Sequence, residues 1–140
     1  MGLGDKFTIH NNYFAGLSGY TQNNKLNDPE FEPASSAHKS FFLQWQIKTH
    51  QKQTGNAEVT KIAWSLKILF KRGQNEPYPD FYETTWNAID TLEKGYLDFG
   101  NGDGGADRVW IEAIELEDLD SNYTLTTLIG TVQFVRDLTV

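Results

Sequence analysis

Apolar and polar residues alternate in two neighbouring stretches of the chain, residues 41–48 and residues 62–70. The apolar positions are Phe41, Leu43, Trp45 and Ile47 in the first stretch, and Ile62, Trp64, Leu66, Ile68 and Phe70 in the second. A period of two is typical of a strand that buries one face and exposes the other. A polar segment, residues 49–56, joins the two stretches. The pattern therefore predicts an antiparallel hairpin with one polar face.

The period changes to that of a helix after the hairpin. The apolar side chains there recur at spacings of four, three and three residues: Tyr82, Trp86, Ile89 and Leu92. Such spacing places them on one side of a helix. Pro79 and Asp80 suit its first turn, Glu83 completes a capping box with Asp80, and Gly95 suits its end. We expect a helix over residues 80–94, lying on the sheet with this apolar side in the core.

Two further apolar runs, residues 109–116 and residues 125–135, predict a second hairpin. The apolar positions change parity in the first of these runs, from Val109 and Ile111 to Ile114 and Leu116. One extra residue in a strand produces such a change, because it moves all later side chains to the other face. A β-bulge is therefore expected near Glu112 or Ala113.

The N-terminal part, residues 1–40, is rich in Asn, Gly, Ser and Pro, and its aromatic residues follow no sustained period. We expect an irregular arm there. Its aromatic side chains, Tyr13 and Phe14 among them, either cap the edge of the core or reach a neighbouring protein. Together the elements predict a single α+β domain over residues 1–140. In it, residues 41–140 form a mainly antiparallel sheet of two hairpins with one long amphipathic helix packed on it.

The composition agrees with one folded domain. The chain has 140 residues, of which 39% are hydrophobic and 14% aromatic. Twelve Lys and Arg stand against nineteen Asp and Glu, a net charge of -7. Because this charge repels phosphates, direct sequence-specific binding of nucleic acid is not expected. We see no basic and apolar leader and no apolar run of membrane-spanning length, so a soluble, cytoplasmic protein without a membrane partner is expected.

A glycine-rich stretch resembles the turn that binds a dinucleotide. Gly100, Gly102 and Gly105 occupy the first, third and sixth positions of that pattern. The context differs, because a strand is predicted where the nucleotide-binding helix should begin, and Asp103 and Asp107 would repel the phosphates. We therefore expect a flexible loop and no cofactor.

An acidic turn resembles the start of a calcium loop, in which oxygen ligands converge on one ion. Asp118, Asp120 and Asn122 have its first, third and fifth spacing. The sixth position is Tyr123 where the loop needs glycine, and the twelfth is Ile129 where it needs glutamate. We expect an acidic hairpin turn and no metal.

Residue types that act in catalysis do not form a known pattern in this sequence. His10, His38 and His50 lie in polar stretches, lack a second ligand at metal-site spacing, and are expected at the surface. The chain has no cysteine, which excludes a disulfide framework, a thiolate zinc site and a cysteine nucleophile. The acidic run over residues 112–120 is expected to be a solvated face, so no catalytic residue and no enzyme activity are expected. An enzyme that uses this acidic strand stays open as an alternative.

The order of the predicted elements is similar to that of the tail-terminator proteins of long-tailed bacteriophages, the lambda type included. The resemblance is carried by residues 63–70 (AWSLKILF), the helix over residues 80–94, and the strands around Val109-Trp110-Ile111 and Thr131-Val132-Gln133-Phe134. It covers about the last hundred residues as an order of elements. Members of that family often begin with a clear amphipathic helix, whereas residues 1–40 show no helical period.

The resemblance implies an α+β subunit that forms a ring, usually a hexamer, on the end of the tail tube. It would stop polymerisation of the tube and offer a surface for head attachment. Its partners would be copies of itself, the tail tube protein and the neck or connector protein, in the virion tail and, during assembly, in the host cytoplasm. A neck or tail-completion protein of the same particle is one alternative. A small module that binds a sugar or peptide through exposed, clustered aromatic residues is another.

Five residues are candidates for contacts with other subunits. Phe42 lies on the polar parity of its strand, so it either anchors an interface or is covered by the N-terminal arm. Asp118 and Asp120 are expected to face the ring lumen or a partner, where negative charge would discourage passing DNA from sticking. Tyr13 and Phe14 are the arm residues that would reach a neighbour.

Overall fold

The computed structural model describes residues 3–28, 30–52, 57–101, 108–120 and 122–137. In this part of the chain the elements are α1 (Leu3–Ala15), β1 (Thr21–Gln22), the short 3-10 turns η1 (Asn24–Asn27) and η2 (Pro33–Ser35), β2 (Ser40–Lys52), β3 (Ala57–Lys71), α2 (Tyr78–Asn101), β4 (Arg108–Asp120) and β5 (Tyr123–Asp137). The architecture is α+β, as the sequence predicted. A mainly antiparallel sheet carries the long helix α2, and α1 is an addition to the expected elements.

The sheet has the strand order β1-β2-β3-β5-β4, so the second hairpin joins the first through its last strand, β5. The four long strands pair antiparallel, and the short β1 runs parallel to β2. Both predicted hairpins are confirmed, with strands that extend beyond their apolar runs. The predicted bulge is also confirmed, because the register of β4 against β5 shifts between Ile111 and Ala113.

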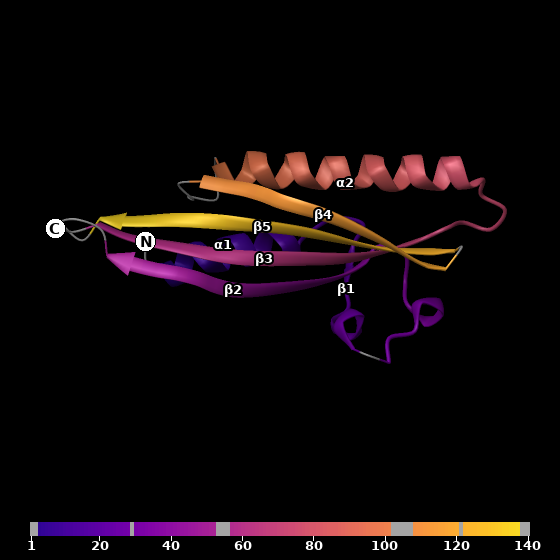
Figure 1. Cartoon of the computed structure of the whole chain (residues 1–140), viewed down its shortest axis with the longest axis horizontal. Helices are drawn as coiled ribbons and strands as arrows, with labels where there is room; N and C mark the ends of the chain where they lie inside the picture. The colour runs from indigo at the N-terminus through magenta and orange to yellow at the C-terminus, as the bar shows by residue number, and fades with distance from the viewer. Residues whose placement is uncertain (1–2, 29, 53–56, 102–107, 121, 138–140) are drawn as a thin grey trace.

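Both helices pack on the same face of the sheet. In Figure 1, α2 runs beside β4, and α1 lies behind the long strands. Phe14 of α1, Trp64 of β3 and Tyr96 of α2 meet there with ring centroids 4.6 to 5.3 Å apart. Alternating residues of the strands complete the core, among them Phe41, Ile62, Leu66, Ile68, Phe70, Leu128, Val132 and Phe134. This three-ring contact therefore ties both helices to the middle of the sheet.

The indole of Trp64, on β3, lies directly against the backbone of β5 at Gly130. Gly130 is the residue paired with Trp64 on β5. A Cβ atom at position 130 would overlap the Trp64 ring and would come within 2.8 Å of the Trp110 carbonyl oxygen. Glycine is therefore required here by space, because the indole occupies the position that a side chain would take.

A buried histidine joins α1 to α2. His10 is fully buried, and its Nδ1 lies 2.8 Å from the Tyr96 hydroxyl oxygen. Burial raises the pKa of Tyr96 well above its usual range, so the hydroxyl stays protonated and available for this bond. The prediction that His10 lies at the surface is therefore wrong, because the core itself supplies a polar partner for the imidazole.

The first part of the predicted irregular arm is a helix, so that expectation is wrong for the residues of α1. Phe7, His10 and Phe14 follow one another at helical spacing, and the last two are fully or almost fully buried. The histidine conceals this period, since it counts as polar in a hydrophobic pattern. Gly19, with a φ of 83°, lies in the turn that follows. The arm proper is confined to the segment between this turn and β2.

The helix α2 is longer than expected at both ends. It begins at Tyr78, which places Asp80 in its first turn and not at its cap. It continues through Gly95, the predicted end, because Tyr96 and Phe99 extend its apolar side. Gly95 instead allows a close approach to α1, where a Cβ atom would lie 3.0 Å from the Tyr13 hydroxyl oxygen.

The buried side of α2 also differs from the prediction in its first half. It is formed by Phe81, Thr85, Ile89, Leu92 and Tyr96. Ile89 and Leu92 are buried as expected, but Tyr82 and Trp86 are exposed. Two apolar sides of the helix can be drawn through Ile89, one with Tyr82 and Trp86 and one with Phe81. In the structure the side with Phe81 packs in the core.

The segment between α1 and β2 lies against one end of the sheet (Figure 1). The Lys71 amine donates a hydrogen bond to the carbonyl of Ser36 at 2.8 Å, and the Lys39 amide donates to the carbonyl of Leu69 at the same distance. Leu69 is fully buried, although it points to the face opposite the two helices. The arm is thus held by the end of the first hairpin.

We expect Gly130→Val to lower the free energy of unfolding by about 1 to 3 kcal/mol, because the added side chain must displace Trp64 from the core. Urea denaturation followed by tryptophan fluorescence measures this change. Gly4→Ala is the control, since a Cβ atom there has no neighbour within 4 Å. It should leave the protein as stable or more stable, because alanine favours the helix. Equal stability of Gly130→Val and the unaltered protein would contradict the packing described here.

Candidate functional site

Three exposed aromatic side chains follow one flank of α2. Tyr78, Tyr82 and Trp86 are spaced four residues apart, and each keeps between 37% and 49% of its surface exposed. We call these three residues the aromatic stripe. Leu116, two residues before Asp118 on the same side of β4, is also exposed. Clustered exposed apolar side chains of this kind mark sites where other proteins bind.

The rotation of α2 about its axis determines where the aromatic stripe lies. The core side carries Phe81 and Thr85, so Tyr82 and Trp86 are turned about a quarter of a revolution away from it. The Tyr82 hydroxyl donates a hydrogen bond to Asp118 of β4, at 3.0 Å, which shows that this flank faces β4. The sequence signal was the four-residue spacing from Tyr78 through Trp86. Its meaning could be recognised only once Phe81 was known to face the core.

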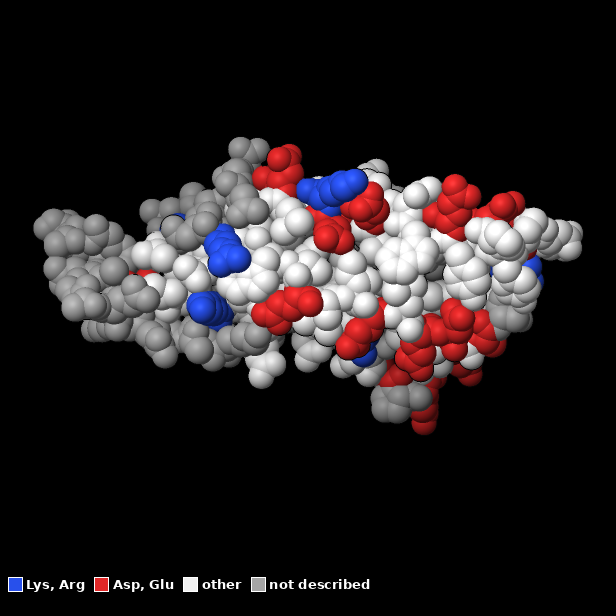
Figure 2. Space-filling view, turned by 45° about the horizontal axis from the view of Figure 1, so that its top comes forward, with Lys and Arg blue, Asp and Glu red and all other residues white. Residues whose placement is uncertain are grey.

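Acidic side chains border the aromatic stripe. Figure 2 shows a band of uncharged side chains over α2 and β4 with red acidic groups on both sides of it. The exposed carboxylates next to the stripe are Glu83 and Asp90 of α2 and Asp118 of β4, whereas Glu115, Glu117 and Asp120 point to the opposite face of the sheet. A polar and charged rim around an apolar centre is the usual anatomy of a protein interface.

Asp118 connects the two elements that form this surface. Its carboxylate accepts one hydrogen bond from Tyr82 of α2 and another from the Thr124 hydroxyl of β5, at 2.8 Å. The bond to Asp118 raises the pKa of Tyr82, because the carboxylate stabilises the protonated phenol. Asp120 acts locally instead, accepting a hydrogen bond from the Asn122 amide at 2.7 Å. Asp118 is thus a positioning residue for the aromatic stripe.

The strand next to the aromatic stripe is an edge of the sheet. β4 stands at one end of the strand order, so within the described residues only one side of its backbone is paired. Exposed glutamates and aspartates follow this edge. Charged side chains on an edge strand discourage indiscriminate pairing with other chains. This surface therefore combines an apolar centre with protection against unspecific aggregation.

The opposite flank of α2 is hollow. Two cavities, of about 420 and 520 Å³, share Lys39 and Thr84 among the residues that line them. The first is closed by Phe70 and Phe81, and the second runs between α2 and the end of α1. We call these two neighbouring cavities together the helix groove.

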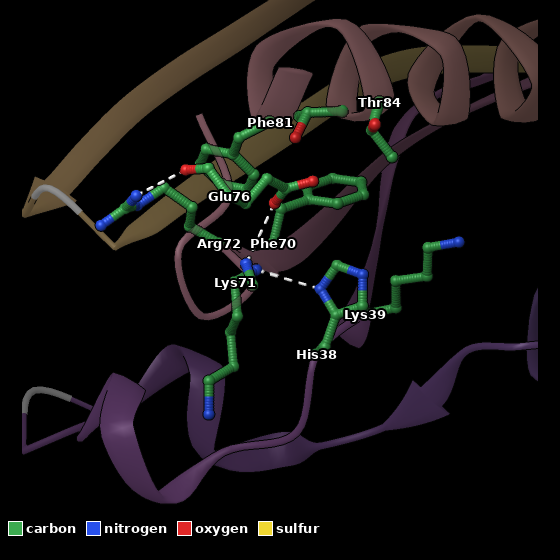
Figure 3. A pocket seen from close by; sticks show the side chains of 10 residues that line it. His38, Lys39, Phe70, Lys71, Arg72, Glu76, Phe81 and Thr84 are labelled. Atoms are coloured by element: carbon green, nitrogen blue, oxygen red, sulfur yellow. Dashed lines mark hydrogen bonds between the residues drawn. The ribbon is translucent and has the colours of Figure 1, made fainter. Parts of the chain in front are cut away.

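Basic side chains surround the first cavity of the helix groove, but two of them point out of it (Figure 3). The Lys71 amine reaches the arm, and the Arg72 guanidinium donates hydrogen bonds to Asn122 and to the Glu76 carbonyl. The Glu76 carboxylate accepts a hydrogen bond from the Gly73 amide at 3.0 Å. His38 Nδ1 accepts the Lys71 amide hydrogen at 3.0 Å, and burial together with Lys39 lowers its pKa. The cavity is thus bordered by positive charge and lined mainly by uncharged side chains.

Lys39 is held in an uncommon backbone conformation at the junction of the two cavities. Its φ of 61° belongs to the left-handed region, which residues other than glycine seldom adopt. Its backbone is fixed on both sides, since its amide bonds to Leu69 and its carbonyl accepts from the Thr21 amide. Strained residues of this kind are often found at functional positions.

The candidate contact residues fall in three different places. Phe14 is only 2% exposed and belongs to the core of its own chain, so it offers no surface to a neighbour. Tyr13 is half-buried, stacks on Phe99 with centroids 4.3 Å apart, and lines the helix groove. Phe42 is half-buried on the face of the sheet that points away from the helices. Asp118 lies beside the aromatic stripe, and Asp120, which pairs with Tyr123, points to the face opposite the helices. Tyr13 and Asp118 therefore remain candidates on the helix-bearing side.

The sequence patterns that resembled known sites find little geometric support. Of the glycine pattern, Gly100 lies in the last turn of α2, while Gly102 and Gly105 lie outside the described residues, as do Asp103 and Asp107. Within the described part of the chain, no group of three or more His, Asp or Glu side chains is placed to hold a metal ion. His38 lies at the surface with part of its ring turned toward the first cavity, and the side chain of His50 lies outside the part of the structure that is described.

No protein-family model matches this chain, and a search of curated proteins found no match. In the described residues, neither helix combines the length and apolar character needed to cross a bilayer. The functional argument therefore depends on the surface itself: the aromatic stripe with its acidic border on one flank of α2, and the helix groove on the other.

We expect Asp118→Asn to lower the pKa of Tyr82 toward its ordinary value, because an amide stabilises the protonated phenol less than a carboxylate does. The Cζ chemical shifts of ¹³C-labelled tyrosine, followed through a pH titration, report this change. Asp120→Asn is the matched control, since Asp120 bonds to a backbone amide, and it should leave the Tyr82 pKa unchanged. An identical Tyr82 titration in both variants would show that Asp118 does not position the aromatic stripe.

Proposed function

We propose that this chain is a structural protein of a bacteriophage tail that resembles the tail terminators. It forms a ring, most simply a hexamer, which caps the tail tube, stops its polymerisation and provides the surface for head attachment. The observation that carries the proposal is the aromatic stripe, exposed on a chain whose core is already closed by other residues. Such a surface is useful to the protein only when another macromolecule covers it.

The composition of the aromatic stripe supports a protein partner. Tryptophan and tyrosine contribute most to the affinity of protein interfaces, and they act best at the centre of a patch with a polar rim. Tyr78, Tyr82 and Trp86 form such a centre, and the carboxylates of α2 and β4 form the rim. The preference among partners follows from charge, since the rim repels acidic surfaces and attracts basic ones.

The arrangement of elements also supports a role of the tail-terminator type. The family implied by the sequence often begins with an amphipathic helix, and α1 occupies that place. Two hairpins in one sheet, with a long helix between them in sequence, complete the order from which the resemblance was drawn. This supports the tail-terminator assignment, and a neck or tail-completion protein of the same particle remains the nearest alternative.

A small ligand-binding module is the second candidate, and the helix groove is the observation that favours it. Its larger cavity has a volume of about 520 Å³, which is within the range of ligand sites. A ligand site of this kind needs polar groups that converge on the ligand. In the smaller cavity, the cationic groups of Lys71 and Arg72 instead turn outward and bond to the protein itself. The groove is therefore better suited to receive side chains of a protein.

Electron microscopy of the purified protein, alone and mixed with tail tube protein of the same particle, tests the proposal. We expect rings, and tubes that stop growing once a ring sits on one end. Trp86→Ala should weaken ring formation by about 2 kcal/mol or more per contact, as for the central residues of other interfaces. Lys25→Ala is the control, because Lys25 is exposed in η1 and belongs to neither the aromatic stripe nor the helix groove. Unaltered protein that stays monomeric and leaves tube growth unchanged would refute the terminator role and favour the ligand-binding module.

A further inference from the structure

The aromatic stripe and the helix groove lie on opposite flanks of the same helix. The stripe faces β4, as the hydrogen bond from Tyr82 to Asp118 shows. The groove lies on the side of α1, and its α2 wall consists mostly of short side chains: Thr84, Asn87, Ala88, Thr91, Leu92 and Gly95. One flank of α2 therefore projects large apolar side chains, and the other leaves a space that such side chains can fill.

The two features match in length. At 1.5 Å per helical residue, the stripe from Tyr78 to Trp86 is about 12 Å long, and the groove wall from Thr84 to Gly95 is about 16 Å long. The floor and far wall of the groove include Leu17, Tyr20 and Phe81, which offer apolar contact. A stripe from a second chain is therefore short enough to lie along the groove.

The two features also match in charge. The stripe is bordered by carboxylates: Asp118 of β4, which bonds to Tyr82, and Glu83 and Asp90 of α2, which lie three and four residues from Trp86. Lys39 stands at the centre of the groove, with its amine 5.2 Å from the centroid of the Tyr20 ring. In a chain of net charge -7, this is positive surface available to an acidic rim.

We propose that the aromatic stripe of one copy of this chain binds in the helix groove of the next copy. The inference rests on the proposed function, because a ring of identical subunits calls for a surface that recognises its own chain. Trp86 and Tyr82 are the anchors, the groove of the next copy is their receptor, and Lys39 of that copy faces the carboxylates that border the stripe.

This interface joins two different surfaces, so each copy keeps one stripe and one groove free after the first contact. Contacts of this type propagate from copy to copy and close into a ring when the rotation between neighbours allows it. A contact between two identical surfaces would stop at a dimer. The position of stripe and groove on opposite flanks of α2 therefore explains how one chain builds a ring.

Mixing two variants that each lose one side of the interface tests the proposal. Trp86→Ala removes the central anchor and keeps the groove. Thr84→Trp fills the groove and keeps the stripe, at an exposed position that lines both cavities. Lys39→Glu reverses the charge of the groove and serves as a second groove variant. Circular dichroism and thermal unfolding establish that each variant is folded before its association is measured.

Sedimentation velocity should show higher oligomers for the unaltered protein, and dissociation constants raised about thirtyfold for Trp86→Ala and Thr84→Trp alone. An equal mixture of these two variants should form a one-to-one dimer and nothing larger, through the single intact stripe and the single intact groove. Lys39→Glu should weaken association, and added salt should weaken association of the unaltered protein, because it screens the attraction between Lys39 and the acidic border. Restored dimers in the mixture would support the proposed interface.

Three outcomes would overturn it: unaltered protein that stays monomeric at millimolar concentration, Thr84→Trp that associates like the unaltered protein, or a mixture that stays monomeric. These outcomes are separate from the test of the proposed function. Rings that cap tubes without this complementation would refute the interface alone. If the mixed variants form dimers but the unaltered protein leaves the growth of tail tubes unchanged, the terminator role is refuted and the proposed interface is still supported.

Discussion

The contact among Phe14, Trp64 and Tyr96 is the interaction on which the rest of the structure depends. It joins one residue from each helix to the central strand β3, and the tryptophan can take its place only because Gly130 leaves room for it. Aromatic rings pack in defined geometries, so this contact fixes the rotation and the height of both helices above the sheet. The His10 to Tyr96 bond reinforces it from the side of α1.

Because the rotation of α2 is fixed, its two outer flanks acquire different characters. One presents the aromatic stripe toward β4, and the other forms the wall of the helix groove beside α1. The carboxylates that border the stripe make the first flank acidic, and Lys39 adds a positive charge to the groove on the second. The packing of three aromatic rings in the core thus determines both outer flanks of α2. Both flanks are exposed in the folded chain as it stands.

The strands, the bulge in β4 and the presence of α2 could be predicted from the sequence, because regular alternation leaves few other arrangements for those residues. The helix α1 could not, since His10 breaks its apolar period and finds its polar partner only in the folded core. The candidate site was harder to predict from the sequence than α1. Tyr82 and Trp86 have the spacing of core residues, and only the competing side with Phe81 and Tyr96 reveals that they are exposed. The groove is formed by segments that are far apart in sequence, such as those that carry Lys39 and Thr84, so its lining could not be read from the sequence.

Disulfide trapping tests the central claim most directly, since the natural chain has no cysteine to interfere. Tyr82→Cys places a thiol on the stripe, and Thr91→Cys places one in the groove. Under mild oxidation, a protein that carries both substitutions should form a ladder of covalently linked copies, while each single variant should remain unlinked. Linked dimers from Tyr82→Cys alone, or no ladder from the double variant, would contradict the account.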